Sequence, residues 1–312
     1  MINIKKIGLT ALAASLVTTS AFAGAMSVSG GASLGVKNTT GTHDPGTKKG
    51  FTMGNSLTFT GGGELDNGLN VALSFELDGG EGNAKTNAPF DSHSLTLSSD
   101  ALGSFKFSGH GGSSAQGAMD GGAAGDIWNT GTGINDIQGA AAGDNSMFYT
   151  FPALLDGVAL TASMAPGAGT AATHTSYGVV YTGVEGLTLK FGQGDSGDSG
   201  AETSSTTMFA SYAIGSFTLG VSNNEADNEA AVNREVDAYQ IAYTITEDMS
   251  VTYGNETYET EGNPTDEEVS AIGVSYTTGG MTISANTYES TGADNVAGAK
   301  TDRWALGLSF AF

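Results

Sequence analysis

Large apolar residues recur at every second position in many short stretches of this chain. In LNVALSFEL, residues 69–77, the odd positions hold Leu, Val or Phe and the even positions hold Asn, Ala, Ser or Glu. The same alternation appears in LTLKF (187–191), SFTLGV (216–221), MSVTY (249–253) and MTISANTY (281–288). Because successive side chains of a strand point to opposite faces, each stretch predicts a β-strand with one apolar face. The helical period is nearly absent after residue 23.

Two kinds of connection alternate along the chain. The short ones are turn-like: LDNG (65–68), SDALG (99–103), PALLDG (152–157), TGVEG (182–186), AIGS (213–216), TITED (244–248) and TTGG (277–280). The long ones are polar and acidic: about 38–50, 79–89, 112–145, 166–175, 194–204, 224–235, 260–267 and 289–300. This pattern predicts sixteen strands joined by seven short turns and eight long connections, with both ends of the chain on the short-turn side.

A closed transmembrane barrel accounts for this arrangement. Strands can cross lipid only if every backbone group is paired, and they then carry apolar residues outward and polar residues inward. Aromatic residues near the predicted strand ends fit the girdles of such a barrel: Tyr181, Tyr212, Tyr253, Tyr258, Tyr276, Tyr288, Trp304 and Phe312. A soluble β-sandwich or solenoid remains the alternative, but its inner face would be the apolar one.

The first 23 residues predict a secretory signal peptide. Lys5 and Lys6 precede a short apolar stretch that ends in AFA, residues 21–23. Cleavage after Ala23 leaves residues 24–312 as the barrel, with nine basic and 33 acidic residues and a formal charge of 9 − 33 = −24. That charge excludes nucleic acid as a partner. The chain has no cysteine, so no disulfide supports the fold.

The chain resembles the general diffusion porins of Gram-negative bacteria, of the alphaproteobacterial type. The resemblance rests on the hairpins at 57–77 and 144–164, on LGSFKFSG (102–109) before one much longer connection, and on the terminal Phe312. It implies a homotrimer in the outer membrane, in contact with membrane lipid and lipopolysaccharide, that passes small hydrophilic solutes. It also implies that the third long connection folds into the barrel, and that the barrel-assembly machinery recognises Phe312, Phe310 and Trp304.

Charged residues at the predicted constriction follow from this resemblance and from the alternation. The third long connection, about 112–145, contains no Lys or Arg, and its Asp120, Asp126 and Asp136 are expected to narrow the pore, with Asp144 at its end. The alternation places five side chains on the inner wall, with His110 as a sixth if its strand stays regular: Lys37, Glu76, Lys106, Lys190 and Arg303. A second interpretation stays open, in which these charged side chains have no role in the pore and face inward only because water is present there.

The balance of charge predicts a weakly selective pore that prefers cations. After the leader the chain has only two arginines, Arg303 and Arg234, and Arg234 is expected in a long connection. A cluster of wall arginines is therefore excluded, and the excess of carboxylates should attract cations. A substrate-specific channel on the same fold and a closed surface adhesin or structural barrel remain alternatives.

No catalytic site is expected. The segment GDSG, residues 194–197, resembles the nucleophile segment of serine proteases, but no His and Asp pair accompanies it. The four histidines lack the spacing of metal ligands. No cofactor is predicted, although Ca²⁺ on the acidic connections stays an alternative, without a complete calcium-loop spacing.

Overall fold

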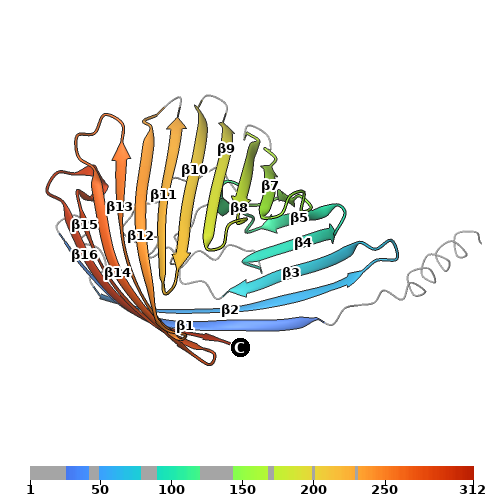
Figure 1. Ribbon diagram of the computed structural model, residues 1–312, viewed down its shortest axis with the longest axis horizontal. Helices are drawn as coiled ribbons and strands as arrows, with labels where there is room; N and C mark the ends of the chain where they lie inside the picture. The colour runs from blue at the N-terminus through green and yellow to red at the C-terminus, as the bar shows by residue number, and fades with distance from the viewer. Residues whose placement is uncertain are drawn as a thin grey trace, which may run out of the picture.

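The computed structural model describes residues 26–41, 49–78, 90–119, 143–167, 172–198, 201–228 and 231–312. These residues form sixteen strands and two short 3-10 helices. Every strand pairs antiparallel with the next, and β1 pairs with β16, so the sheet closes into a barrel (Figure 1). The predicted all-β barrel of sixteen strands is confirmed. The predicted leader lies outside the described residues.

The first half of the barrel contains β1 (Ser27–Gly41), β2 (Lys49–Glu64), β3 (Asn70–Asp78), β4 (Ser92–Ser99), β5 (Gly103–His110), η1 (Gly117–Met119), β6 (Ser146–Thr150), β7 (Val158–Ala165) and β8 (His174–Tyr181). The second half contains β9 (Leu187–Asp198), β10 (Ala201–Ile214), β11 (Phe217–Asn228), β12 (Arg234–Thr246), β13 (Met249–Thr260), β14 (Glu267–Thr278), β15 (Met281–Thr291), η2 (Ala293–Asn295) and β16 (Lys300–Ala311). Among the described residues, no helix has the length and apolar composition needed to cross a membrane.

The last strand closes the barrel against the first. Leu308 lies opposite Leu34 in the register of β16 and β1. One residue beyond β16, Phe312 donates its amide to the Gly30 carbonyl at 3.0 Å, and Gly30 returns a 2.8 Å bond to the Phe312 carbonyl. The terminal residue is therefore part of the closing ladder.

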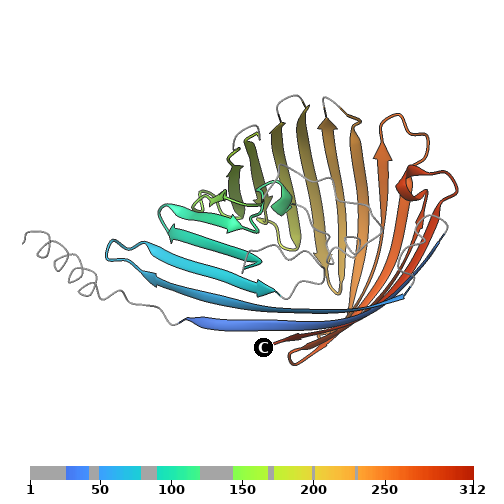
Figure 2. The ribbon, with the colours of Figure 1, turned by 180° about the vertical axis from the view of Figure 1, so that it is seen from behind.

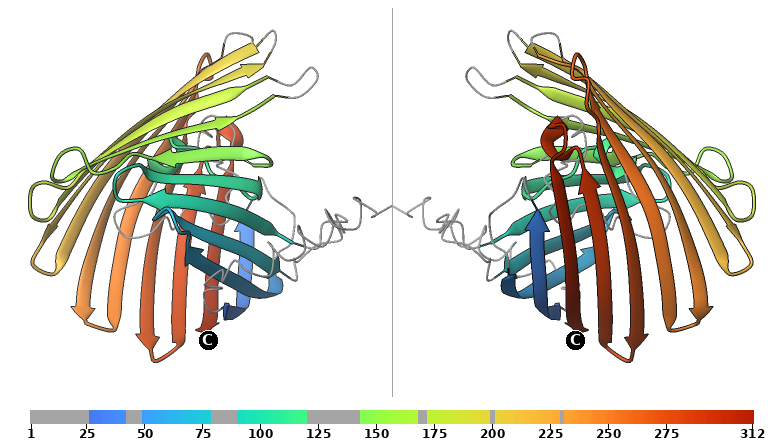
Figure 3. Two further views of the ribbon diagram at one scale, coloured as in Figure 1. Left: turned by 90° about the vertical axis from the view of Figure 1, so that its right-hand side faces the viewer. Right: turned by 90° about the vertical axis from the view of Figure 1, so that its left-hand side faces the viewer.

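The short connections gather at one end of the barrel, which we call the turn end. All seven predicted turns join consecutive strands there. Three of them have only two residues: those between β10 and β11, β12 and β13, and β14 and β15. In the first, Gly215 has a φ of 59°, a left-handed conformation that suits a two-residue hairpin. Figure 3 shows the C-terminus at the same end as the turn between β14 and β15. We call the opposite end the loop end.

The two faces of the sheet differ as the alternation predicts. On β8 and β10, Ser176 and Thr207 are buried and face the barrel interior, where η1 lies. Their neighbours Tyr177 and Met208 point outward and are 64% and 46% exposed. An apolar outer face and a largely polar inner face distinguish this barrel from a soluble sandwich, whose apolar faces are turned inward.

Several predicted long connections are mostly strand. Only two residues separate β9 from β10, where a connection over 194–204 was expected. Strands β11 and β12 likewise extend to Asn228 and from Arg234, so Arg234 begins a strand instead of lying in a loop. The outward residues are large and apolar only where the strand crosses the apolar outer band. Backbone pairing between the strands continues past that band. The prediction therefore placed the strand ends too early.

Two aromatic residues assigned to the outer girdles face inward. Tyr288 is 3% exposed and packs with Val269 and Ala271 on the inner face. Tyr258 packs partly buried against the same group and against Val236. Both lie near the loop end, where the inner wall has an apolar patch that composition alone does not reveal. The other six predicted girdle residues have the outward positions that the alternation gives them.

The wall of the barrel is uneven. Strands β4–β8 have only five to eight residues, whereas β9–β16 have eleven to fourteen. Figure 3 shows the long strands of the second half reaching well beyond the short ones. We call β4–β8 the short wall.

Candidate functional site

The start of the third long connection lies inside the barrel. The described part, residues 111–119, leaves β5 and ends in η1, which rests against β8, β9 and β10 (Figure 2). Ala115, Gln116 and Met119 are 0%, 1% and 3% exposed. The prediction that this connection folds inward is confirmed for these residues. We call Ser114–Met119 the loop stem.

Side chains of the inner wall hold the loop stem through its backbone. Ser163 on β7 accepts a 2.9 Å hydrogen bond from the Ala115 amide through its Oγ. Ser176 on β8 accepts one of 3.1 Å from the Gln116 amide, and the two serine hydroxyls are 2.7 Å apart. The wall therefore satisfies buried amides that the short 3-10 turn leaves unpaired.

The neck of the same loop is closed by a second set of contacts. His110 Nδ1 bonds to Asp144 Oδ1, and the Gly112 amide donates to the Gly143 carbonyl at 3.1 Å. The β4–β5 register shifts at His93, so the strand is irregular where the placement of His110 required it to be regular. His110 is thus located at the loop neck by its contact with Asp144.

Lys37 and Arg303 are brought together on neighbouring strands. Lys37 lies opposite Ala305, and Arg303 lies opposite Thr39, so the two cations are diagonal neighbours on the inner face of β1 and β16. Both have the inward position that the sequence predicts. This pair is the densest positive charge on the inner strand positions described here.

Arg303 is anchored by an aromatic ring on the adjacent strand. Its side chain is 8% exposed, and its Nη1 donates to the Tyr288 hydroxyl at 3.1 Å. The guanidinium carbon lies 5.3 Å from the centre of the same ring, a cation–π distance. Arg303 therefore has a fixed position on the wall, in contrast to a freely rotating surface arginine.

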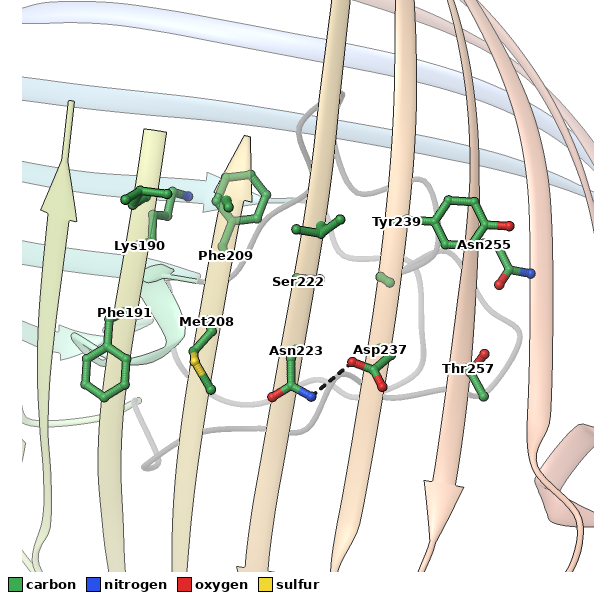
Figure 4. Close-up of a pocket in the computed structure, with 14 residues that line it drawn as sticks. Lys190, Phe191, Met208, Phe209, Ser222, Asn223, Asp237, Tyr239, Asn255 and Thr257 are labelled. Atoms are coloured by element: carbon green, nitrogen blue, oxygen red, sulfur yellow. Dashed lines mark hydrogen bonds between the residues drawn. The ribbon is translucent and has the colours of Figure 1, made fainter. Parts of the chain in front are cut away.

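The remaining predicted wall charges are separate from one another. Figure 4 shows Lys190 beside Phe209, and the Lys190 ammonium lies 4.9 Å from the centre of that ring. Lys106 on β5 is in register with Phe148 on β6. Glu76 on β3 accepts a 3.3 Å hydrogen bond from Ser92 on β4. The inward parity of these charges is confirmed, but they form no single cluster.

The three aspartates predicted at the constriction, Asp120, Asp126 and Asp136, lie outside the described residues. Asp144 is described and takes part in the neck contact with His110.

Sequence reasoning missed the residues that seat the loop stem. Thr161, Gly178, Gly192 and Thr207 form one inner row across β7–β10, each in register with the next. A side chain on Gly192 would place its Cβ 2.9 Å from Gln116 Cα. A local signal exists, because both glycines occupy inward positions of otherwise regular strands, and a strand glycine often marks a close backbone approach.

The outer face of the long strands becomes acidic toward the loop end. Glu225, Glu235 and Glu259 are directly opposite one another on β11, β12 and β13. Asn223 donates to Glu235 at 2.7 Å and to Asp237 at 3.0 Å; Figure 4 shows the second bond. Within the described ranges, no group of three or more acidic or histidine side chains is arranged to hold a metal ion. Calcium on the acidic connections stays a prediction.

A groove of about 610 Å³ lies on the outer face of β9–β13, just below this acidic zone. Its outward lining is mainly apolar, with Phe191 and Met208 on one side and Tyr239 on the other (Figure 4). The groove is on the opposite side of the sheet from the loop stem, so it is not part of a path through the barrel.

Comparison with solved structures supports the fold. An anion-selective porin from Comamonas acidovorans superposes with a TM-score of 0.72 at 16% identity, covering 92% of this chain and 99% of that chain. OmpF of Salmonella typhi, in complex with daunomycin, gives 0.72 at 13% identity, covering 92% and 97%. OmpT of Vibrio cholerae gives 0.69 at 16% identity with the same coverage.

A search of curated protein sequences finds no match. The sequence profile of a family described as Gram-negative porin matches residues 8–247. That match covers more than half of the 312 residues and agrees with the closed barrel and its inward loop, so the chain belongs to the Gram-negative porin family.

Proposed function

We propose that this outer-membrane porin is a water-filled channel for the passive diffusion of small hydrophilic solutes and ions, with a preference for cations. Family membership makes the protein a porin channel of the outer membrane and gives no indication of enzymatic activity. The observation that carries the proposal is the loop stem, docked on a polar inner wall at Ser163 and Ser176. In such a barrel the loop narrows the interior, and no apolar core fills it.

The preference for cations rests on the distribution of carboxylates. The chain has 33 acidic and 11 basic residues, yet the inward strand positions carry Lys37, Lys106, Lys190 and Arg303. Glu76, Glu256 and Glu267 are carboxylates at inward positions of the same wall, and the last two are 5% and 2% exposed. Carboxylates at the loop end and the loop aspartates add to these inward carboxylates and raise the local cation concentration at the entrance.

The constriction is proposed to combine loop carboxylates with wall cations. Its proposed members are Asp120, Asp126, Asp136, Glu76, Lys37, Lys106, His110 and Arg303. The pairing of Lys37 with Arg303 supports a positive side of the wall, facing an acidic loop. A transverse field of this kind orients solutes but discriminates weakly between ions.

Ion selectivity tests this proposal. The refolded protein in a planar bilayer with a KCl gradient should show a reversal potential of the sign that marks K⁺ preference. Replacing Asp120, Asp126 and Asp136 together by Asn should move the reversal potential toward Cl⁻. Glu185→Gln, in the turn between β8 and β9, is the matched control and should leave it unchanged. A reversal potential that marks Cl⁻ preference in the unaltered protein would contradict the proposal.

A homotrimer is proposed as the assembled form. Strands that cross lipid need about 9–11 residues, whereas the short wall has strands of five to eight. Its apolar outer face therefore suits contact with protein better than contact with lipid. Native mass spectrometry in detergent should give the mass of three chains, and a mass of one or two chains would contradict the trimer.

Contacts with the membrane and with the assembly machinery are proposed as well. The apolar outer face of the long strands supports contact with membrane lipid, and the acidic zone at the loop end supports contact with lipopolysaccharide through divalent cations. Trp304 and Phe310 lie on the outer face of β16, and the exposed Phe312 follows one residue beyond that strand. Their position on the closing strand supports a role as the signal for the barrel-assembly machinery.

A further inference from the structure

The loop stem has one polar side chain that reaches across two strands of the wall. Gln116 is 1% exposed, and its Nε2 donates to Thr207 Oγ1 on β10 at 2.5 Å. Its backbone amide donates to Ser176 Oγ on β8, two strands away from β10. Gln116 Oε1 is buried without a hydrogen-bond partner among the described residues, so the bond from Nε2 to Thr207 is the polar contact that holds this side chain in place.

The wall beneath Gln116 has the complementary shape. Gly178 and Gly192 are directly paired on β8 and β9, and Thr161 and Thr207 flank them in the same inner row. A Cβ on Gly178 would lie 2.7 Å from the Ala115 carbonyl oxygen, and one on Gly192 would lie 2.9 Å from Gln116 Cα, both backbone atoms of the loop stem. The loop stem therefore occupies a gap that only glycine leaves open, with a hydroxyl acceptor at its edge.

We propose that Gln116 is the positioning residue of the pore: its bond to Thr207, above the Gly178–Gly192 gap, fixes where the third long loop leaves the wall and thereby sets the width of the channel. The inference rests on the proposed function, because it assumes that this loop limits the current. Gln116 contacts no permeating ion in this scheme. It acts through the loop that it holds.

The Gln116 bond attaches the loop stem to a third strand of the wall. The neck holds the loop where it leaves and rejoins the barrel, through Gly112 and Gly143. The backbone of the stem is bound at Ser163 on β7 and Ser176 on β8, and the Gln116 side chain extends this attachment to Thr207 on β10. The neck and these two backbone bonds remain when the Gln116 side-chain bond is lost, so its loss should free only the β10 side of the stem and add a wider open state without unfolding the barrel.

Single-channel recording of the full chain tests this inference. Gln116→Leu keeps the volume and removes the amide, and Thr207→Val keeps the shape and removes the acceptor. Each should raise the fraction of open time in a wider conductance level about tenfold, the ratio expected when a buried hydrogen bond is lost. The double variant should change no more than either single one, because both remove the same bond.

The matched control is Thr218→Val, on the inner face of β11 near the turn end, where the loop stem does not reach. It should keep the conductance pattern of the unaltered protein. Heat stability of all variants in detergent should stay close to that of the unaltered protein, which separates positioning from a general structural defect. Thr207→Val leaves the loop sequence intact, so the test holds even if Gln116→Leu fails to insert.

The outcomes separate the two proposals. If the unaltered protein conducts and the Thr207→Val channel spends no more time in a wider level, Gln116 does not position the loop, although the channel function stands. If the unaltered protein gives no current, the proposed function itself is wrong.

Discussion

At the scale of single residues, the seam that closes the barrel depends on a close contact between a glycine backbone and an aromatic ring. Gly30 on β1 lies under the ring of Phe312, and a Cβ at Gly30 would be 2.6 Å from Phe312 Cε2. The same residues exchange two backbone hydrogen bonds. The closing seam therefore leaves no room for a side chain at Gly30 unless the Phe312 ring that covers it moves.

Gly30→Ala should destabilise the closed barrel. The new methyl group must displace the Phe312 ring and the end of the Leu57 side chain. Both side chains are exposed and can move, so the loss of unfolding free energy should stay below the ~1–3 kcal/mol that overpacking costs in a closed core. Gly61→Ala is the matched control, because Gly61 is a glycine of β2 whose new methyl group would have no neighbouring atom within 4 Å. Reversible unfolding in urea measures both, and equal stabilities of the two variants would contradict this account of the seam.

Tyr288→Phe should weaken the anchoring of Arg303. The ring and its cation–π contact remain, but the hydroxyl that accepts the Nη1 bond is lost. Removing an acceptor from a buried charged donor costs about 1–3 kcal/mol. Tyr276→Phe, on the outer face near the turn end, should cost less. Unfolding curves that rank the two variants in the opposite order would count against the proposed anchor.

The sequence predicts some residue positions well and others poorly, for a physical reason. Lys37, Lys106 and Arg303 were placed correctly because strand alternation is a local property. Gln116 was missed because its position depends on a loop meeting strands that are distant in sequence. Tyr288 was assigned to the outer girdle from its residue type, although its own alternation with Thr287 and Glu289 points it inward.

At the scale of the elements, the long strands of the second half extend beyond the apolar band. Their outer positions change there from Leu, Tyr and Ile to carboxylates, while the backbone ladder continues without interruption. Several of the connections are therefore shorter in the structure than the sequence predicted. Hydropathy identifies where a strand leaves the apolar layer, and backbone pairing decides where it ends.

Glu235→Gln should stabilise the loop end of β11–β13 in dilute salt. Glu235 lies between Glu225 and Glu259, and like charges directly opposite in a sheet cost about 0.2–1 kcal/mol per pair. The gain should disappear near 1 M salt, where the screening length falls to about 3 Å. Thermal unfolding at two salt concentrations measures this effect.

The control for this variant is Glu247→Gln, in the turn between β12 and β13, where no such row exists. It should have little effect at either salt concentration. A stabilisation by Glu235→Gln that persists unchanged in high salt would show that repulsion between carboxylates is not its cause.

At the scale of the whole molecule, the apolar side chains form a band on the outer face of the sheet. Charged side chains lie on the inner face and, on the outer face, toward the loop end. Apolar side chains cover the outer band, and carboxylates cover the outer surface at the loop end. Charged side chains of both signs face inward, among them Lys37, Arg303, Glu256 and Glu267. This distribution explains how a chain with a net charge of −22 fits a membrane without a single apolar helix among its described residues. The fold was predictable at this scale because sixteen alternating segments all agree.

The conductance of the refolded protein in a planar lipid bilayer tests the central claim most directly. If the barrel is a water-filled channel narrowed by its own loop, the current should rise in steady, uniform steps, and the size of a step should grow with salt concentration. Correctly folded protein that inserts into the bilayer and gives no steps would contradict the claim, and would indicate a closed structural barrel instead.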